Sequence, residues 1–386
     1  MSDLLNATLD RASESPVVFA KFLSPNDTGL TGGHQCGIYI PKSCVPLIFD
    51  KQFERGENHK RSATIVWNDE ITTESSFTYY GIGTRNEYRI TRFGRGFDLL
   101  KPDHTGDLVV ICKQSAELYY AYVLSTDEEI ESFLDAYSLS PIELNRLIRN
   151  EESLEPLDED ELFDSFVCKF DGEFPSTFTM AMTAQEAYRR LHDDELDISP
   201  DELIVRWTET EYRLFRHIEA VHYEWVTLEP AKSLDSFVQT GLEITNRRKS
   251  RAGKSLEHHL ASIFEMHKLS FSAQAVTEEN KKPDFIFPSE EAYHDPNFPT
   301  EKLIFLGAKT TCKDRWRQVL KEADRLPHKY LFTLQQGVSP NQLKLMQSEK
   351  LTLVVPKQYH HTFPPDAGVA VISLEDFITM VEKTQT

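Results

Sequence analysis

The chain has 386 residues, of which 40% are hydrophobic and 27% are charged, and its formal net charge is −20. This length predicts two domains, each large enough to bury its own core, and the composition is that of a soluble globular protein. No apolar run approaches the roughly 18 residues of a membrane span. The N-terminus lacks the basic start and apolar core of a signal peptide, so a cytoplasmic protein without a membrane partner is expected. The five cysteines are scattered without a C-x-x-C pair, which argues against a zinc site.

The acidic charge is unevenly distributed. Between residues 127 and 164, fourteen acidic residues and two arginines contribute −12 of the total. Basic residues gather within residues 85–95, 247–254 and 309–317. A protein can bind DNA through such patches while the rest of it is acidic. Each patch alone is also typical of an ordinary solvated surface.

Residues 1–125 are predicted to form mostly β-structure. Short runs rich in β-branched and aromatic residues alternate with turn-forming residues, which is typical of a barrel-like or sandwich domain. Two segments stand out as loops, residues 27–41 and 83–96. The second combines arginines with Asn86 and Glu87, residue types that can read base edges in the major groove. A surface cluster of salt bridges is the simpler alternative.

The middle of the chain begins with an acidic segment, residues 126–165. It is predicted to be a linker or hinge helix, with the alternative that it covers a basic cleft as an internal mimic of DNA. Residues 166–250 are predicted to be largely helical because apolar residues recur every three or four positions. A basic, turn-like segment then leads into a helix over residues 255–267. Glu257 is either an acid in the first turn of this helix, where the helix dipole favours it, or a carboxylate brought beside a metal site.

The most informative stretch runs from residue 283 to residue 322. It predicts a strand that begins after Asp284, a second strand that ends at Lys309, and a helix that contains Glu322. Carboxylates suit a hard divalent cation, which can polarise a phosphoryl oxygen and activate a water molecule. A lysine beside them can hold that water or the developing negative charge. The pattern is consistent with metal-assisted phosphodiester hydrolysis, although a Pro-Asp turn and a strand that ends in lysine are individually common.

Longer strings of residues resemble the EcoRII family of type II (type IIE) restriction endonucleases. In the first half they are N-D-T-G-L-T-G-G-H-Q-C-G-I-Y-I-P and T-R-N-E-Y-R-I-T-R-F-G-R-G. In the second half they are N-R-R-K-S-R-A-G-K-S-L-E, N-K-K-P-D-F-I-F-P, A-Y-H-D and K-T-T-C-K-D-R-W-R-Q. The resemblance covers both halves and is weakest between about residues 100 and 240.

The resemblance implies an α/β multi-domain fold. A B3-like, β-barrel-like effector-DNA-binding domain would span residues 1–150, an acidic linker residues 151–165, and a PD-(D/E)xK catalytic and dimerisation domain residues 166–386. It implies a bacterial homodimer that cuts both strands of DNA at a CCWGG-type site with Mg²⁺. A second, effector site would be needed because the N-terminal domain otherwise restrains the catalytic cleft.

The resemblance also implies roles for single residues. Asp284 and Glu322 match the metal-binding carboxylates, Lys309 the catalytic lysine, and Glu257 a glutamate of the preceding helix. Glu322 lies thirteen residues after the lysine, whereas Gly307 occupies the more usual acid position. The DNA-contacting matches are Lys313, Asp314 and Arg315 for the C·G pairs of the substrate, and His34, Tyr39, Arg85, Glu87 and Arg89 for the effector.

Two departures and two rival functions remain. Gly83 and Tyr88 stand where EcoRII has lysines, so weaker effector affinity or a weaker salt dependence is expected. A non-catalytic, sequence-specific regulator on a nuclease-like fold is one rival, and the intact set of Asp284, Lys309 and Glu322 argues against it. A structure-specific repair nuclease is the other, and the separate effector domain argues against that.

Overall fold

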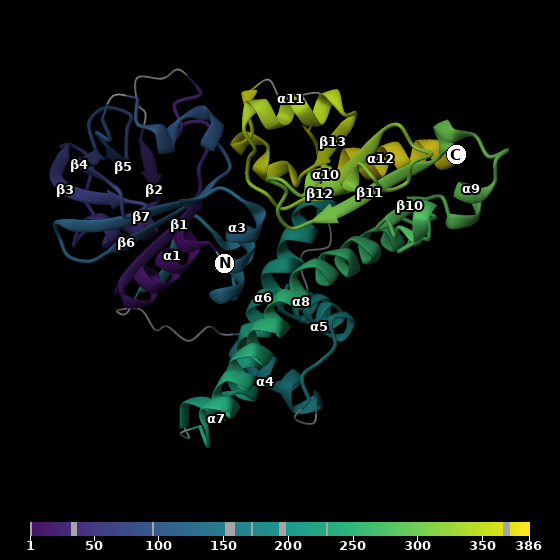
Figure 1. The fold of residues 1–386 in the computed structure, drawn as a ribbon, viewed down its shortest axis with the longest axis horizontal. Coiled ribbons are helices and arrows are strands. Elements are labelled where there is room, and N and C mark those ends of the chain that lie inside the picture. The colour runs from purple at the N-terminus through teal and green to yellow at the C-terminus, as the bar shows by residue number, and fades with distance from the viewer. Residues whose placement is uncertain are drawn as a thin grey trace.

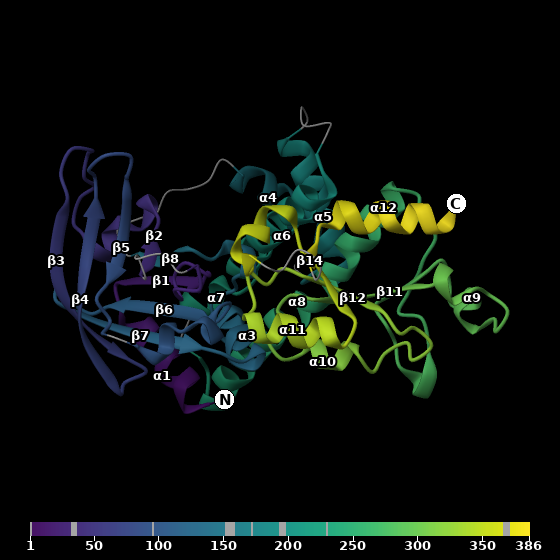
Figure 2. The same ribbon diagram turned by 90° about the horizontal axis from the view of Figure 1, so that it is seen from above.

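The computed structural model describes residues 2–31, 37–94, 96–150, 159–170, 173–192, 198–228, 231–365 and 371–386. Two β-sheets lie side by side, and a group of long helices extends away from them (Figure 1). Helix α3 (Asp127–Ala136) lies where the two sheet regions meet, as the view from above shows (Figure 2). None of the helices in these ranges combines the length and the hydrophobicity of a membrane-spanning segment.

The first sheet has eight strands and a barrel-like curvature. Its strands, in spatial order, are β2 (Ile38–Ile40), β5 (Glu87–Thr91), β4 (Ile71–Tyr80), β3 (His59–Trp67), β7 (Leu118–Leu124), β6 (Leu108–Lys113), β1 (Val17–Phe22) and β8 (Arg146–Asn150). One face encloses a core around Trp67 and Phe77. The other face packs against α1 (Asp3–Glu14) and α3 through residues such as Leu5 and Phe133. Helix α3 therefore belongs to the packing of this half.

The expectation that residues 27–41 and 83–96 are loops is partly wrong. Strand β2 lies in the first segment, where a short β-rich run at residues 37–40 was also expected, and the unexpected strand β5 lies in the second and pairs antiparallel with it. In β5, Tyr88 and Ile90 point into the core while Glu87 and Arg89 point outward. The charged residues on the outward face obscured this alternation in the sequence. Helix α1 and strand β8 were not expected either.

The second sheet has six strands with helices on both faces. The strands, in spatial order, are β14 (Val371–Ile372), β13 (Leu351–Val354), β12 (Lys329–Thr333), β11 (Ile304–Lys309), β10 (Phe285–Phe287) and β9 (Ser272–Ala273). Strands β11 to β14 are parallel, and β9, β10 and β11 pair antiparallel. The helices of this half are α4 (Asp160–Val167), α5 (Thr177–Leu191), α6 (Pro200–His222), α7 (Glu224–Leu228), α8 (Leu234–Met266), α9 (Glu290–His294), α10 (Trp316–Val319), α11 (Pro340–Ser348) and α12 (Leu374–Gln385).

Side chains that alternate along the strands divide the core into two layers. Phe285 and Leu306 face α6, α8 and α12. Ile286 and Phe305 face α10 and α11. The prediction of a small mixed sheet with a helix before and after it is confirmed.

The basic segment before residue 255 is helical, so the prediction of a turn there is wrong. Helix α8 runs for 33 residues through this segment. Its basic side chains pack on α6: Arg251 is buried with its guanidinium 3.7 Å from the ring centroid of Tyr212, and Arg248 forms a bidentate pair with Glu219. Since Glu257 lies far from the start of α8, the first-turn explanation for this acid is excluded.

The expected helix around Glu322 is much shorter than predicted. Helix α10 has only four residues, and Glu322 lies in the bend that follows it. Ala323 adopts a left-handed backbone (φ 52°), which ends the helical conformation. Lys329 donates hydrogen bonds to the carbonyl oxygens of Glu322 and Ala323 and so fixes this bend.

The two halves meet in a close backbone contact between two glycines. A Cβ atom on Gly106 would lie 2.1 Å from the carbonyl oxygen of Gly337, and Gly106 has a φ of 83°. Gln335 donates a hydrogen bond of 2.9 Å to the carbonyl of Gly106. The two halves are therefore in direct contact immediately beside β6 and β12.

Candidate active site

Asp284 precedes β10 and is held by contacts to both of its carboxylate oxygens. Its Oδ2 accepts a hydrogen bond from the backbone N–H of Ala308 (2.8 Å) and lies 3.3 Å from Nζ of Lys309. Its Oδ1 accepts from Nε2 of Gln274 (3.1 Å). Because β10 and β11 pair antiparallel, the start of one strand lies beside the end of the other. The predicted aspartate and lysine are thus brought together by the sheet itself.

Glu322 reaches the same place because Gly307 has no side chain. A Cβ atom on Gly307 would lie 3.2 Å from both Cγ atoms of Val319 on α10. The missing side chain therefore lets α10 lie close to β11. Three residues beyond Val319, the Glu322 carboxyl lies near Asp284 and Lys309, whose charges act on its pKa. Glu322, which follows α10, therefore supplies the second acid of the site, although position 307 carries no carboxylate.

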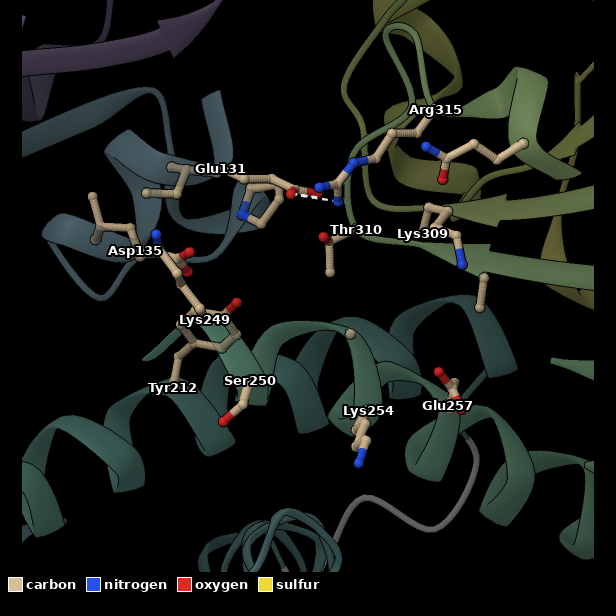
Figure 3. A pocket seen from close by; sticks show the side chains of 16 residues that line it. Glu131, Asp135, Tyr212, Lys249, Ser250, Lys254, Glu257, Lys309, Thr310 and Arg315 are labelled. Atoms are coloured by element: carbon tan, nitrogen blue, oxygen red, sulfur yellow. Dashed lines mark ion pairs between the residues drawn. The ribbon is translucent and has the colours of Figure 1, made fainter. Parts of the chain in front are cut away.

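Glu257 approaches from the opposite wall. It projects from α8 toward the side of the cleft that carries Lys309 (Figure 3), and its Oε2 accepts a hydrogen bond of 2.8 Å from Nε2 of Gln274. Burial and then the charge of Asp284 raise the pKa of Glu257 to about 7. The same two causes raise the pKa of Glu322 to about 7, partly offset by Lys309. The nearby lysines therefore do not fully offset the cost of placing negative charge on these buried acids.

Such a donor set is suited to a hard divalent cation. In the described part of the chain, no three acidic, histidine or cysteine side chains converge closely enough to form a complete metal cage. Mg²⁺ usually takes only one or two protein carboxylates and completes its coordination with water and substrate phosphate. Asp284 and Glu322 could supply those two carboxylates, and a cation between them would relieve their mutual repulsion.

The segment Lys313–Asp314–Arg315 lies against the first half of the molecule. The carboxylate of Asp127, at the start of α3, accepts hydrogen bonds from all three backbone N–H groups at 2.9, 2.7 and 2.8 Å. The side chain of Lys313 is buried and forms an ion pair of 2.5 Å with Asp107. The three residues that the resemblance implies for base reading therefore make intramolecular contacts here.

Helix α3 contacts this cleft along one face. Glu131 forms an ion pair of 2.5 Å with Arg315, drawn as a dashed line in Figure 3, and accepts a hydrogen bond of 3.0 Å from Thr311. One turn further along, Asp135 points into the cleft near Lys249 (Figure 3). Residues of α3, α8 and β11 together line a cavity of about 390 Å³ that includes Glu257 and Lys309.

The proposed effector-contacting residues gather on β2 and β5. Tyr39 and Arg89 are direct partners across these two strands. Arg89 lies 3.2 Å from Glu87, which points outward on the same strand. Arg85, just before β5, has its guanidinium 5.5 Å from the ring centroid of Tyr80. His34 lies outside the described residues.

The two departures from the EcoRII pattern differ in their surroundings. Tyr88 is buried, and its hydroxyl accepts a hydrogen bond of 2.7 Å from the N–H of Phe53. Gly83 has a φ of 69°, with open space where a Cβ atom would be. Position 88 therefore belongs to the core, and only position 83 lies where a lysine would reach solvent.

Sequence reasoning missed the residues that hold the predicted ones in place. Gln274, Asp107, Asp127 and Glu131 contact Asp284, Lys313, Asp314 or Arg315 through space. Two signals in the sequence pointed to α3, namely the acidic character of residues 126–165 and the capped helix start S-T-D-E-E at their beginning. No spacing in the sequence connects Gln274 or Asp107 with the site.

The mixed sheet, with Asp284 before one strand and Lys309 at the end of its neighbour, is that of the PD-(D/E)xK, restriction-endonuclease-like class. A family model described as "EcoRII C terminal" matches residues 215–378, and one described as "Restriction endonuclease EcoRII, N-terminal" matches residues 12–147. The type II restriction enzyme EcoRII of Escherichia coli is 37% identical over 98% of this chain and 97% of its own length. The chain belongs to the EcoRII family of type II restriction endonucleases and is a site-specific deoxyribonuclease.

Solved structures with a partial likeness include two other restriction endonucleases. One is metal-depleted Ecl18kI in complex with uncleaved, modified DNA, with 18% identity, a TM-score of 0.45, and coverage of 60% of this chain and 85% of that one. The other is a complex of PspGI with substrate DNA, with 15% identity, a TM-score of 0.43, and coverage of 55% and 93%.

The contact between Asp127 and Asp314 predicts a pH dependence of stability. Burial by itself would raise the pKa of Asp127, but hydrogen bonds from Asp314, Arg315 and Lys313 outweigh it and lower this pKa. Burial and the hydrogen bond to Asp127 raise the pKa of Asp314 from 3.8 to about 6. Between about pH 4 and pH 6, Asp314 therefore keeps a proton in the folded protein that it has lost in the unfolded chain. The stabilisation from this group is present below about pH 4 and declines as pH rises to about 6.

We expect Asp314→Asn to remove this decline, because the amide can donate to Asp127 at every pH. Thermal unfolding of the variant and the wild type should coincide near pH 4, and the variant should be more stable above pH 7. Glu301→Gln, which alters an exposed carboxylate elsewhere, serves as the control. Parallel pH profiles for Asp314→Asn and wild type would contradict the shared proton.

Proposed function

We propose that this protein cuts both strands of DNA at a CCWGG-type site by Mg²⁺-dependent hydrolysis, under the control of a second copy of the site. The observation that carries the proposal is the convergence of Asp284, Glu322, Glu257 and Lys309 at the edge of one sheet. In this proposal residues 1–150 bind effector DNA, residues 151–165 link the halves, and residues 166–386 cut and dimerise.

The residues of the site have distinct roles in this proposal. Asp284 and Glu322 would hold Mg²⁺, which when bound would polarise the scissile phosphate and make water a better nucleophile. Lys309 orients the attacking water and stabilises negative charge as it develops on the phosphate. The hydrogen bond from Ala308 to Asp284 keeps the carboxylate beside the lysine. Glu257 adds a carboxylate on the opposite wall that can accept a proton, because its pKa lies near 7.

The contact between the two halves represents a restrained state. The cavity of about 390 Å³ beside Lys309 has the size of a small-molecule site. It is too small for a DNA duplex, whose specific interfaces bury roughly 1,000–2,500 Å² of protein surface. Helix α3 forms one wall of that cavity. DNA therefore reaches Lys309 only after α3 has moved away from the cleft.

Carboxylates on α3 occupy positions suited to DNA phosphates. Asp127 and Glu131 are four residues apart, so they project from one face of the helix. Asp127 accepts hydrogen bonds from the three backbone N–H groups of residues 313–315, and Glu131 forms an ion pair with the guanidinium of Arg315. Backbone N–H groups and arginine are also the groups that bind phosphate oxygens. This supports the interpretation of α3 as an internal mimic of DNA.

Effector DNA can influence this restraint through a second cavity, of about 520 Å³. Tyr39 and Arg89 line it from the first half, and Gln358 and His361 line it from the second. A duplex seated on β2 and β5 would therefore lie against both halves at once. Binding energy gained there can favour their separation, since a ligand shifts an equilibrium by its differential affinity for the two states.

Once α3 has moved, Lys313, Asp314 and Arg315 become available to substrate DNA. Arginine and lysine can donate to the O6 and N7 atoms of guanine, and aspartate can accept from the amino group of cytosine. These chemistries together suit a C·G pair. The central W position has no equivalent assignment among these three residues.

A homodimer is supported by an exposed apolar arm, defined as α7 and residues 234–246 of α8. The arm lies at the far end of the helices from both sheets (Figure 1). Leu228, Leu234 and Phe237 are 71%, 76% and 59% exposed. Apolar patches of this kind mark protein–protein interfaces. A second copy is the expected partner because one chain carries one catalytic set, and a double-strand cut needs two.

The first prediction from this proposal concerns Lys309, the lysine at the end of β11. Lys309→Ala should lower the cleavage rate by about 10²-fold or more, since a preorganised charge at the reacting phosphate is lost. Binding of the same DNA in Ca²⁺ should change little. Single-turnover cleavage of a CCWGG duplex in Mg²⁺, with EDTA as the metal-free comparison, measures this. Lys302→Ala is the matched control on an exposed turn, and wild-type cleavage by Lys309→Ala would refute the assignment.

The second prediction concerns the restraint by α3. The double variant Asp127→Asn/Glu131→Gln should cut a plasmid with a single CCWGG site faster than wild type does. A loss of about 1.4 kcal/mol from the closed state would raise the open population about tenfold. Wild type should cut a multi-site plasmid faster than a single-site plasmid.

The control for that experiment is Glu128→Gln, which removes one charge from an exposed position of the same helix. It should leave the preference for the multi-site plasmid intact. An unchanged preference in the double variant would show that α3 does not provide the restraint. Equal and fast cutting of both plasmids by wild type would instead argue against effector control altogether.

The third prediction concerns the apolar arm. Phe237→Asp should convert a dimer into a monomer, because it places a charge in the middle of the apolar surface. Sedimentation velocity gives the mass directly. Leu345→Asp, at another exposed leucine on α11, should remain dimeric. A Phe237→Asp variant that sediments as a dimer would place the interface elsewhere.

A further inference from the structure

Gln274 occupies the space between two of the acids of the site. A single atom, Nε2, donates to Oε2 of Glu257 at 2.8 Å and to Oδ1 of Asp284 at 3.1 Å. Only the nitrogen side of the amide can face two carboxylates, because the oxygen would repel both. The two acids approach from different elements, α8 and the start of β10, and Gln274 is the direct link between them.

The backbone holds Gln274 in this position. Its N–H donates a hydrogen bond of 3.0 Å to the carbonyl oxygen of Asp284, which extends the pairing of β9 with β10 by one residue. Its φ of 53° lies in the left-handed region, which is unfavourable for a glutamine. Backbone strain of this kind is concentrated at functional sites, where the surrounding contacts hold the residue in place.

Each carboxylate of Asp284 and Glu257 thereby has a defined orientation. Lys309 and Ala308 hold Oδ2 of Asp284, and Gln274 holds Oδ1. Within the described residues, the Glu257 carboxylate receives its hydrogen bond from Gln274. Without that bond, repulsion by the charge of Asp284 would drive the Glu257 side chain away. The neutral amide brings the two acids together without adding charge that would compete with a cation.

We propose that Gln274 is a positioning residue that holds the Asp284 carboxylate in the orientation needed to bind a divalent cation and fixes Glu257 beside it. This inference rests on the proposed Mg²⁺-dependent cleavage. Partners that orient metal ligands typically change metal affinity by 10- to 100-fold when removed. Loss of the amide is therefore expected to weaken cation binding more than it slows the reaction at saturating cation.

The test uses the full-length chain with Gln274→Met. Methionine has a similar length and the same left-handed strain but no hydrogen-bond donor, so the substitution isolates the amide. Binding of Mn²⁺ by the free protein is measured by the electron paramagnetic resonance signal of unbound Mn²⁺. The variant should bind Mn²⁺ about tenfold more weakly and should need about tenfold more Mg²⁺ for half-maximal single-turnover cleavage. Its maximal rate should fall by a smaller factor than its Mn²⁺ affinity does, and its melting temperature should stay near the wild-type value.

Other outcomes overturn the inference in distinguishable ways. Unchanged Mn²⁺ binding and an unchanged Mg²⁺ requirement would show that the amide has no positioning role. Tighter binding would show that the amide obstructs the cation site. If wild type itself shows no metal-dependent cleavage, the proposed function fails rather than the role of Gln274. Should the methionine variant misfold, Gln274→Gly removes both the amide and the backbone strain, and the same two titrations decide the question.

Discussion

The carboxylate of Asp284 is the contact on which the arrangement of the site depends. It accepts from the backbone of β11, pairs with Lys309 and is linked through Gln274 to Glu257 on α8. The sheet, the strand end and the long helix are thus joined at one group. Burial of several acids close together is electrostatically unfavourable, and this cost explains why the site is suited to a cation rather than to a neutral ligand.

The second organising contact couples that site to the other half of the molecule. Asp127 is bound to the backbone N–H groups of residues 313–315 with three short hydrogen bonds, and Lys313 is buried against Asp107. A buried ion pair contributes little net stability, because desolvation offsets much of its attraction. A restraint of this kind can hold the cleft closed and yet be exchanged for phosphate contacts, since DNA offers the same groups an equivalent negative partner.

The sequence allowed much of the fold class and of the acid–lysine set to be predicted. Periodicity revealed most strands, and the strings around Asp284 and Lys309 indicated the family. The length of α8 could not be predicted, because burial of Arg251 on Tyr212 stabilises a helix through residues that look like a basic turn. The position of Glu322 was misjudged for a related reason, since contacts of Lys329 with the backbone define a bend that local propensity does not show.

What the sequence conceals most completely is the set of groups that act on the site from a distance in the chain. Gln274 and Asp127 belong to no motif, and each is recognised only through the atoms that it contacts. Their physical roles are related, because each satisfies or arranges charge that the site would otherwise leave unbalanced. Gln274 does so within the catalytic half, where it links two acids, and Asp127 does so across the junction, where the proposed control requires a reversible contact. The same electrostatic constraint therefore underlies both the proposed chemistry and its proposed control.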